Sequence, residues 1–447
     1  SSPYITSKRR WGQVDTHFPG LRTKRIGKGT QMSMSSELLP GKTRWETRRE
    51  ITRMQKRAAM MSSTGIKSAW PQTQTVGDIV GLCLLVDFPD VPATISKAEV
   101  EAFCNQRGYR GFGNNGSVYD YFFDNSGGRL RYTCIVAPYY TAKHKREYYT
   151  DKDQIYGVRA QGLIREALDD LKTQGFDFGR LSVGSNKSVC ATNVFYAGDV
   201  VNCHRKGLWP HTDYVYPDYQ LMPGRMVSLY QITNTGNELS LGTFCHENGH
   251  MLCAFPDLYD LKEDGFESYG VGGFCLMGFG CEIDKKNPTQ VSAYLKYQAG
   301  WADSVTSLSP GLNATIRAGV NDFFIYQKNQ FEYFIIENRQ QAGRDQSIPG
   351  SGLVIWHIDE LGKNENQNMT SESHYECALV QADGEFDLER AEVNGYYGEA
   401  KDLYYAGGNT HFGPSTNPGS QWWDGTFSGL DISDIGSSGV LMTFKAM

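Results

Sequence analysis

The chain has 447 residues, a formal net charge of −6 and 40% hydrophobic residues. This is enough apolar side chain to bury one large or two moderate cores, and no run approaches the twenty apolar residues that a membrane-spanning helix needs. The composition therefore excludes a membrane span. The 26 Tyr and 49 Gly residues favour a β-containing, loop-rich extracellular protein over a helical bundle.

Charge is distributed unevenly along the chain. Residues 1–75 hold 15 Lys and Arg against 4 Asp and Glu, a net +11, whereas residues 76–447 hold 29 against 46, a net −17. Opposite signs favour an intramolecular partner over nucleic acid, for which the sequence has no recognisable binding module. We interpret residues 1–75 as a basic pro-segment that docks in cis and carries basic pairs open to trypsin-like activators. The alternative is a basic tail with no inhibitory role.

Secondary structure can be predicted at several points along the rest of the chain. The apolar run Ile79–Phe88 predicts a buried strand that opens a domain over residues 76–300. Helical spacing of apolar residues predicts a helix over 157–173. Met226–Ile232 is a predicted strand that either lines a cleft and pairs with extended peptide or is an ordinary sheet strand. Short alternating segments beyond residue 301 predict a β-rich part, 301–447, packed on the first domain.

The most specific signal is His246-Glu247-Asn248-Gly249-His250, which fits the pattern H-E-x-x-H. On a helix, residues four apart share a face, so the two imidazoles can bind one tetrahedral Zn²⁺ while Glu247 remains as a general base. Flanking apolar residues predict a buried helix that begins at an N-cap Ser240 and ends before Pro256. The alternative is a pair of hydrogen-bonded structural histidines.

A zinc hydrolase needs a third protein ligand and an open position for water. Asp257, seven residues beyond His250, is the predicted third ligand, and the alternative for it is an ordinary turn aspartate. Three later acidic residues are the fallback ligands: Glu263, Asp264 and Glu267. Met277, in a glycine-flanked turn, resembles the methionine turn that lies under the metal of metzincin proteases.

These motifs, with Phe255-Pro256-Asp257-Leu258-Tyr259-Asp260 and Cys275-Leu276-Met277-Gly278, resemble the immune inhibitor A family of secreted bacterial metallopeptidases, the cowrin-like group. Four further segments carry the resemblance, which spans roughly residues 76–440: Ser117–Phe122, Leu208–His211, Ser292–Lys296 and Pro349–Asp359. The resemblance implies an α+β, zincin-like or metzincin-like fold with the active-site helix under a mixed sheet and a β-rich C-terminal part. It also implies His246 and His250 as zinc ligands, Glu247 as catalytic base and an acidic residue of Pro256–Asp260 as third ligand.

The chain departs from the related metzincin pattern at three positions. Cys253 stands where a glycine is usual, and Asp257 lies one position later than in the strict spacing. Phe279 stands two residues after Met277, where some metzincins carry a transition-state tyrosine. Stabilisation of an oxyanion must therefore come from another group.

The resemblance implies a secreted zinc metalloendopeptidase, a hydrolase made as a zymogen that acts on protein or peptide substrates. Two other classes remain open: a catalytically inactive protease-fold binding or adhesion protein, and a zinc hydrolase of non-peptide amides. The first cysteine is Cys83, so an inhibitory cysteine ligand from residues 1–75 is excluded. The remaining candidates to cap the metal from that segment are Asp15, His17, Glu37, Glu46 and Glu50.

Ten cysteines, an even number, allow disulfide bonds in an exported protein, and a bridge among Cys245, Cys253, Cys275 and Cys281 would fix the Met277 turn against the zinc helix. Buried free thiols are the alternative. Structural Ca²⁺ is a further candidate cofactor, although none of its ligand candidates matches an EF-hand loop: His357, Asp359, Asp383, Glu385, Asp387 and Glu389. His211 is either a substrate contact or a buried, hydrogen-bonded histidine.

Overall fold

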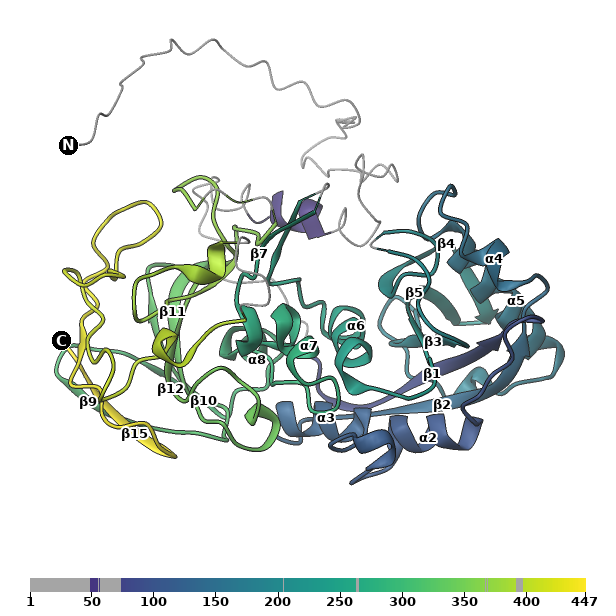
Figure 1. Ribbon diagram of the computed structural model, residues 1–447, viewed down its shortest axis with the longest axis horizontal. Helices are drawn as coiled ribbons and strands as arrows, with labels where there is room; N and C mark the ends of the chain where they lie inside the picture. The colour runs from purple at the N-terminus through teal and green to yellow at the C-terminus, as the bar shows by residue number, and fades with distance from the viewer. Residues whose placement is uncertain are drawn as a thin grey trace, which may run out of the picture.

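The computed structural model describes residues 49–54, 56, 74–203, 205–262, 265–365, 367, 369–390 and 397–447. The described chain is an α+β structure in which helices surround one mixed sheet, and further sheets build the C-terminal part (Figure 1). None of the described helices has the length and apolarity needed to cross a membrane.

The first sheet has five strands in the order β2-β1-β3-β5-β4. Four strands run parallel, and β4 pairs antiparallel with β5 at the edge. Their bounds are β1 Gly77–Asp87, β2 Leu130–Thr141, β3 Thr192–Tyr196, β4 His211–Met222 and β5 Arg225–Asn234. β5, the strand expected from Met226–Ile232, is paired on both sides, so it is an interior strand and cannot itself receive an added peptide strand.

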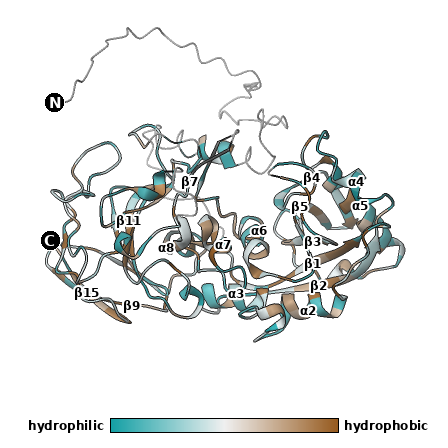
Figure 2. Ribbon diagram, viewed as in Figure 1, coloured by the Kyte–Doolittle hydropathy of each residue, from teal (hydrophilic) through white to brown (hydrophobic). Residues whose placement is uncertain are grey.

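The sequence of β1 explains why helices cover both faces of this sheet. Successive side chains of a strand point to opposite faces, and residues 81–86 are all buried. Leu82 and Leu84 pack into a core with α5 (Val158–Thr173). Cys83 and Leu85 pack into a second core with three helices: α2 (Lys97–Asn105), α3 (Val118–Asn125) and α6 (Leu241–Cys253). Figure 2 shows hydrophobic residues concentrated in these strands.

The C-terminal part holds two more sheets. One has the order β13-β12-β11-β10-β8, and the other has the order β14-β15-β9. Their strands are β8 Ser304–Ser307, β9 Leu312–Arg317, β10 Asp322–Gln327, β11 Glu332–Arg339, β12 Gly352–Asp359, β13 Cys377–Leu379, β14 Ile432–Ser433 and β15 Leu441–Ala446. Phe323 and Trp356 share a core with Phe244 of α6, so residues on both sides of position 301 pack together.

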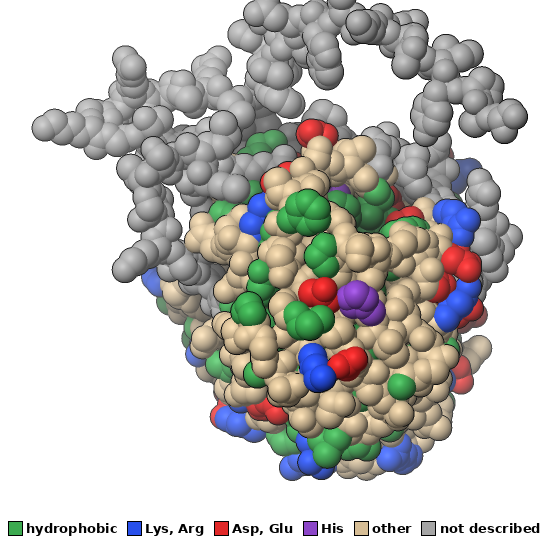
Figure 3. Space-filling model, turned by 90° about the vertical axis from the view of Figure 1, so that its left-hand side faces the viewer, with side chains coloured by type: hydrophobic (Ala, Val, Ile, Leu, Met, Phe, Trp, Pro, Cys, Tyr) green, Lys and Arg blue, Asp and Glu red, His purple; other side chains and the backbone are tan. Residues whose placement is uncertain are grey.

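The smaller elements complete the chain. They are α4 Arg146–Tyr149, β6 Asp260–Lys262, β7 Gly265–Ser268, α7 Cys281–Ile283 and α8 Ala293–Gln298. On the face made by the C-terminal part, hydrophobic side chains are scattered among polar atoms (Figure 3). The most exposed of the large apolar side chains there is Phe427, at 76%.

The expected elements agree closely with those observed. The strand at Ile79–Phe88 is β1, the helix over 157–173 is α5, and the C-terminal alternating segments are β9 to β12 and β15. The expected N-cap of α6 is at the predicted residue, but its side chain makes no capping hydrogen bond. Ser240 occupies the N-cap position, but its hydroxyl donates to the Lys285 carbonyl, and Asn114 accepts the Leu241 N–H at 3.2 Å. The capping group comes from a residue far away in sequence.

Candidate functional site

Helix α6 brings the two predicted imidazoles together on one face. The Nε2 atoms of His246 and His250 lie 3.1 Å apart. The helix ends at Cys253, and Ala254 follows in a left-handed conformation with φ of +57°, which turns the chain back toward the histidines. Asp257 Oδ1 then lies 3.0 Å from His246 Nε2 and 3.2 Å from His250 Nε2. The three predicted ligands therefore converge on one point.

Backbone carbonyls fix the orientation of both imidazoles. His246 Nδ1 lies 3.1 Å from the Leu276 carbonyl, and His250 Nδ1 lies 2.7 Å from the Phe255 carbonyl. A carbonyl only accepts, so each Nδ1 carries a proton, and in its neutral form each ring directs the lone pair of Nε2 toward the other ring and toward Asp257. Three acceptors at 3.0–3.2 Å repel one another unless a cation lies between them.

The charges of the candidate ligands shift one another's pKa values. Burial would raise the pKa of Asp257, but His250 and His246 hold it well below its usual value. Burial would lower the pKa of His246, but Cys281 and Asp257 raise it well above its usual value.

The donor set also fits zinc in type and in spacing. Two imidazole nitrogens and one carboxylate are a common catalytic zinc set, and the carbonyls behind the rings are the usual second partners of zinc-bound histidines. Ligand atoms about 2.0–2.1 Å from a tetrahedral Zn²⁺ lie about 3.3 Å apart. The observed separations of 3.0–3.2 Å are slightly shorter, so the residues need little movement to hold the ion.

Glu247 lies beside this set and has its own support. Its carboxylate Oε2 and its backbone carbonyl both lie 2.9 Å from the hydroxyl of Thr212, which is on the edge strand β4. Glu247 is 7% exposed, and burial raises the pKa of its carboxyl, an effect that His250 and His246 oppose. Glu247 is therefore a buried carboxylate beside the candidate metal ligands, oriented by a hydroxyl.

Met277 packs under the helix as expected for a methionine turn. It is fully buried, and its backbone carbonyl accepts the Leu258 N–H at 2.8 Å. A Cβ on Gly249 would lie 2.8 Å from the Met277 sulfur, closer than real Cβ atoms approach. Gly249, between the two histidines, therefore allows Met277 to reach the helix.

Three polar groups near the site escaped the sequence analysis. The Tyr259 ring stacks near His246 with centroids 6.3 Å apart, and burial, followed by the nearby Asp257, raises the pKa of the Tyr259 hydroxyl well above its usual value. The Cys281 thiol lies close enough to His246 to raise the pKa of its imidazole. Tyr259 was within reach of sequence reasoning, because it lies two residues after Asp257. Thr212 was not, because 35 residues separate it from Glu247.

The other predicted positions have separate outcomes. Glu263 and Asp264 lie outside the described residues, as do Asp15, His17, Glu37, Glu46 and the side chain of Glu267.

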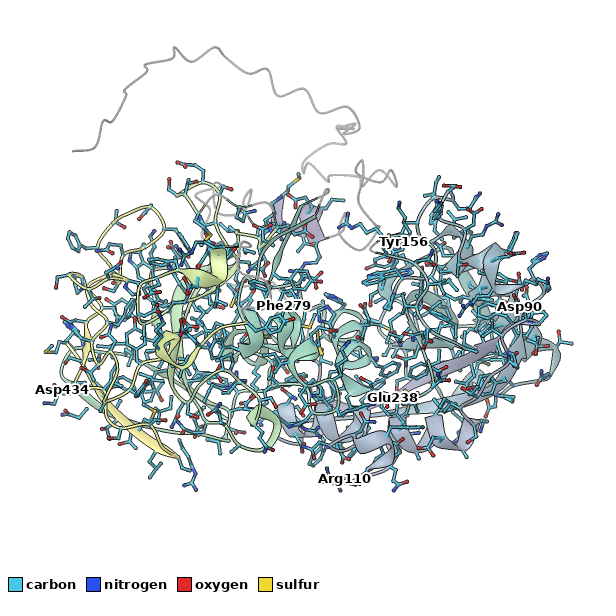
Figure 4. The ribbon with its side chains drawn as sticks, viewed as in Figure 1. Asp90, Arg110, Tyr156, Glu238, Phe279 and Asp434 are labelled. Atoms are coloured by element: carbon cyan, nitrogen blue, oxygen red, sulfur yellow. The ribbon has the colours of Figure 1, made fainter. Side chains whose placement is uncertain are left out.

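His211 is buried, with its ring nitrogens 2.6 Å from the Trp209 carbonyl and 2.8 Å from the Tyr230 hydroxyl. Of the two alternatives for this residue, the structure therefore supports the buried, hydrogen-bonded histidine. In Figure 4, Tyr156 and Phe279 lie on opposite sides of α6.

The calcium candidates mostly have protein partners. His357 lies 3.3 Å from Glu332, and Asp359 lies 2.8 Å from His374. The Asp383 and Glu385 carboxylates converge with Glu399, and the Lys401 ammonium lies 3.0–3.2 Å from all three. The last two candidates have neighbours of their own: Asp387 pairs with Arg390, and Glu389 accepts a hydrogen bond from Gln381. The calcium hypothesis therefore stays a prediction.

All ten cysteines are free, so the expected disulfide bonds are absent from the structure. Cys245, Cys253, Cys275 and Cys281 are all buried. Burial raises the pKa of the first three thiols, which behave as small apolar groups in the core. Packing, and not a bridge, joins the Met277 turn to α6.

Comparison with models of known protein families finds no match, and no curated protein matches the chain.

Proposed function

We propose that this protein is a secreted zinc-dependent endopeptidase that its N-terminal segment holds latent. The observation that carries the proposal is the close approach of three atoms: His246 Nε2, His250 Nε2 and Asp257 Oδ1. Backbone carbonyls contact both Nδ1 atoms and so direct both Nε2 atoms toward the point where a cation would bind. The buried carboxylate of Glu247 beside that triangle supplies the second part of a hydrolytic site. The family resemblance of the motifs supports export and peptide substrates.

The chemistry divides between the metal and this chain's own residues. When bound, Zn²⁺ would polarise the scissile carbonyl and lower the pKa of water. Glu247 takes the proton of the attacking water and delivers it to the leaving amine, a role suited to a carboxylate whose pKa is raised by burial. The Thr212 hydroxyl keeps this carboxylate in one orientation.

The substrate has a natural place beside β4. This strand is the outermost of the first sheet in the described chain, and it carries Thr212, which contacts Glu247. An extended peptide that lies along β4 would run past the site. The cleft-lining role that the sequence suggested for Met226–Ile232 is therefore proposed for β4.

Contacts of the N-terminal segment support latency. Arg49 donates to the Ala254 carbonyl at 2.5 Å, at the end of α6, and Thr75 donates to the Leu252 carbonyl at 3.2 Å. Both contacts lie within about one helical turn of His250. Limited trypsin cleavage of the full chain, with activity followed alongside, tests whether loss of the segment activates the enzyme.

Glu247→Gln tests the catalytic role directly. We expect the trypsin-activated variant to bind zinc stoichiometrically and to lose about 10²–10⁴-fold in the rate of casein cleavage, the usual range for a general base. Glu238→Gln is the matched control, since Glu238 lies just ahead of α6 and its side chain is 63% exposed. Wild-type cleavage by the Glu247 variant would refute the role. Stoichiometric zinc in a wild-type protein that cleaves nothing would favour the inactive binding protein.

A further inference from the structure

The N-terminal segment contacts the body through one charged face. Residues 49–54 are helical and are drawn in purple beside β7 in Figure 1. Arg49, Arg53 and Lys56 are spaced four and three residues apart, so a helix presents them on the same side. Their side chains are 10–24% exposed, which means that the body covers most of each one.

Two carboxylates of the body receive these three cations. Arg49 Nη2 lies 3.3 Å from Glu376 Oε2, and Arg53 Nη2 lies 3.6 Å from the same oxygen. Lys56 Nζ lies 2.8 Å from Glu360 Oε2. The Glu376 side chain is 7% exposed and the Glu360 side chain 11% exposed, so both carboxylates are largely withdrawn from water.

The body holds both carboxylates in place with neutral donors. Tyr294 donates to Glu376 Oε1 at 2.6 Å. Gln298 and Tyr333 donate to Glu360 Oε1 at 2.6 and 3.1 Å. These donors belong to α8 and β11, two elements of the folded body, so the body itself contributes to holding the carboxylates.

Neutral donors do not compensate a buried negative charge as a cation does. Burial would raise the pKa of Glu376, but Arg49 and Arg53 lower it below its usual value. In the contacts between described residues, every cation that pairs with Glu360 or Glu376 comes from the segment. Removal of the N-terminal segment would therefore leave the Glu360 and Glu376 carboxylates without their cations, and both would require new positively charged partners.

We propose that Glu360 and Glu376 form a recognition site for basic peptide segments that carry Lys or Arg on one helical face. Residues 49–56 fill this site in cis, and a basic segment of another protein fills it after the N-terminal segment departs. The second step rests on the proposed removal of that segment. The site is distinct from the metal ligands, and it directs the enzyme toward basic polypeptides.

A binding experiment on the full chain tests the site without any catalysis. The probe is a fluorescent synthetic peptide with the sequence of residues 44–58, and fluorescence anisotropy at low salt reports its binding. The protein is the triple variant Arg49→Gln, Arg53→Gln and Lys56→Gln, in which the cis segment has lost the charges that hold it. We expect the peptide to bind this variant at least tenfold more tightly than wild type, where the tethered segment competes.

Two changes then identify the site. Adding Glu360→Gln and Glu376→Gln to the triple variant is expected to weaken binding at least tenfold. Adding Glu101→Gln and Glu238→Gln, which remove the same charge at side chains 55% and 63% exposed, is expected to leave binding unchanged. A second peptide with Gln in place of Arg49, Arg53 and Lys56 is expected to bind at least tenfold more weakly, and it tests the site even if the carboxylate variants fold poorly.

Equal binding of the two peptides, or equal weakening by both pairs of carboxylate variants, would overturn the proposal. The binding is expected to persist when a chelator is present. If a chain that takes up no zinc still bound the peptide, the recognition site would be supported and the proposed peptidase function would be refuted.

Discussion

Thr212→Val isolates the part that the edge strand plays in catalysis. The substitution keeps the shape of the side chain but removes the hydroxyl, which lies 2.9 Å from both Glu247 Oε2 and the Glu247 carbonyl. A hydrogen bond to a charged group contributes about 1.5–3 kcal/mol. Because the Thr212 hydroxyl shares one proton between two acceptors, about half of this hydrogen-bond free energy stabilises the carboxylate. Its loss corresponds to a roughly three- to tenfold decrease of kcat/KM on the acid side of the pH profile.

The direction of the pH effect follows from which form of Glu247 the hydroxyl stabilises. Thr212 donates to the ionised carboxylate, so its removal raises the pKa of Glu247 further and moves the acid limb of kcat/KM to higher pH. The assay is cleavage of a fluorogenic peptide by trypsin-activated protein from pH 4.5 to 8, with zinc content measured in each sample. Thr212→Ser keeps a hydroxyl and should preserve the wild-type limb. An unchanged acid limb in the zinc-loaded Val variant would refute the reasoning.

Three further predictions concern the support around the site. Gly249→Ala places a Cβ 2.8 Å from the Met277 sulfur, so an overpacking cost of about 1–3 kcal/mol should outweigh a helix-propensity gain of about 1 kcal/mol. Urea unfolding should show a net loss of stability, and adding Met277→Ala should relieve the overpacking. Additive losses of stability from the two substitutions would contradict this. Burial lowers the pKa of His211 to about 4, so the stability that the neutral imidazole contributes, up to about 3 kcal/mol, should be lost as pH falls from 6.5 to 4. The difference in unfolding free energy between wild type and His211→Gln should change over this range, and a constant difference would contradict the prediction. Tyr259→Phe removes a hydroxyl that lies close enough to Asp257 to interact with its charge, and it should weaken zinc binding about 10–100-fold in a chelator competition. Unchanged affinity would assign Tyr259 to packing alone.

The sequence predicted those parts of the site that depend on local spacing. His246 and His250 share a helical face because they are four residues apart, and Asp257 returns to them because the helix stops within a few residues. Periodicity likewise located β1 and α5, since each has a single strong pattern. These features need no knowledge of the rest of the fold.

Features that depend on long-range packing were not predictable in the same way. Thr212 reaches Glu247 only because β4 is the edge strand, and strand order cannot be read from a strand's own residues. Asn114 caps α6 from 127 residues away. The charge division of the chain indicated an intramolecular partner for the basic segment, but it could not identify Glu360 and Glu376. These residues adjoin the paired ends of β12 and β13, and donors from α8 and β11 hold their carboxylates.

Anomalous scattering at the zinc absorption edge tests the central claim most directly. Crystals of the full chain grown at neutral pH with zinc and without chelator should show a peak about 2.0–2.2 Å from His246 Nε2, His250 Nε2 and Asp257 Oδ1. A map with no peak between these atoms, and with the two imidazoles directed apart, would contradict the account.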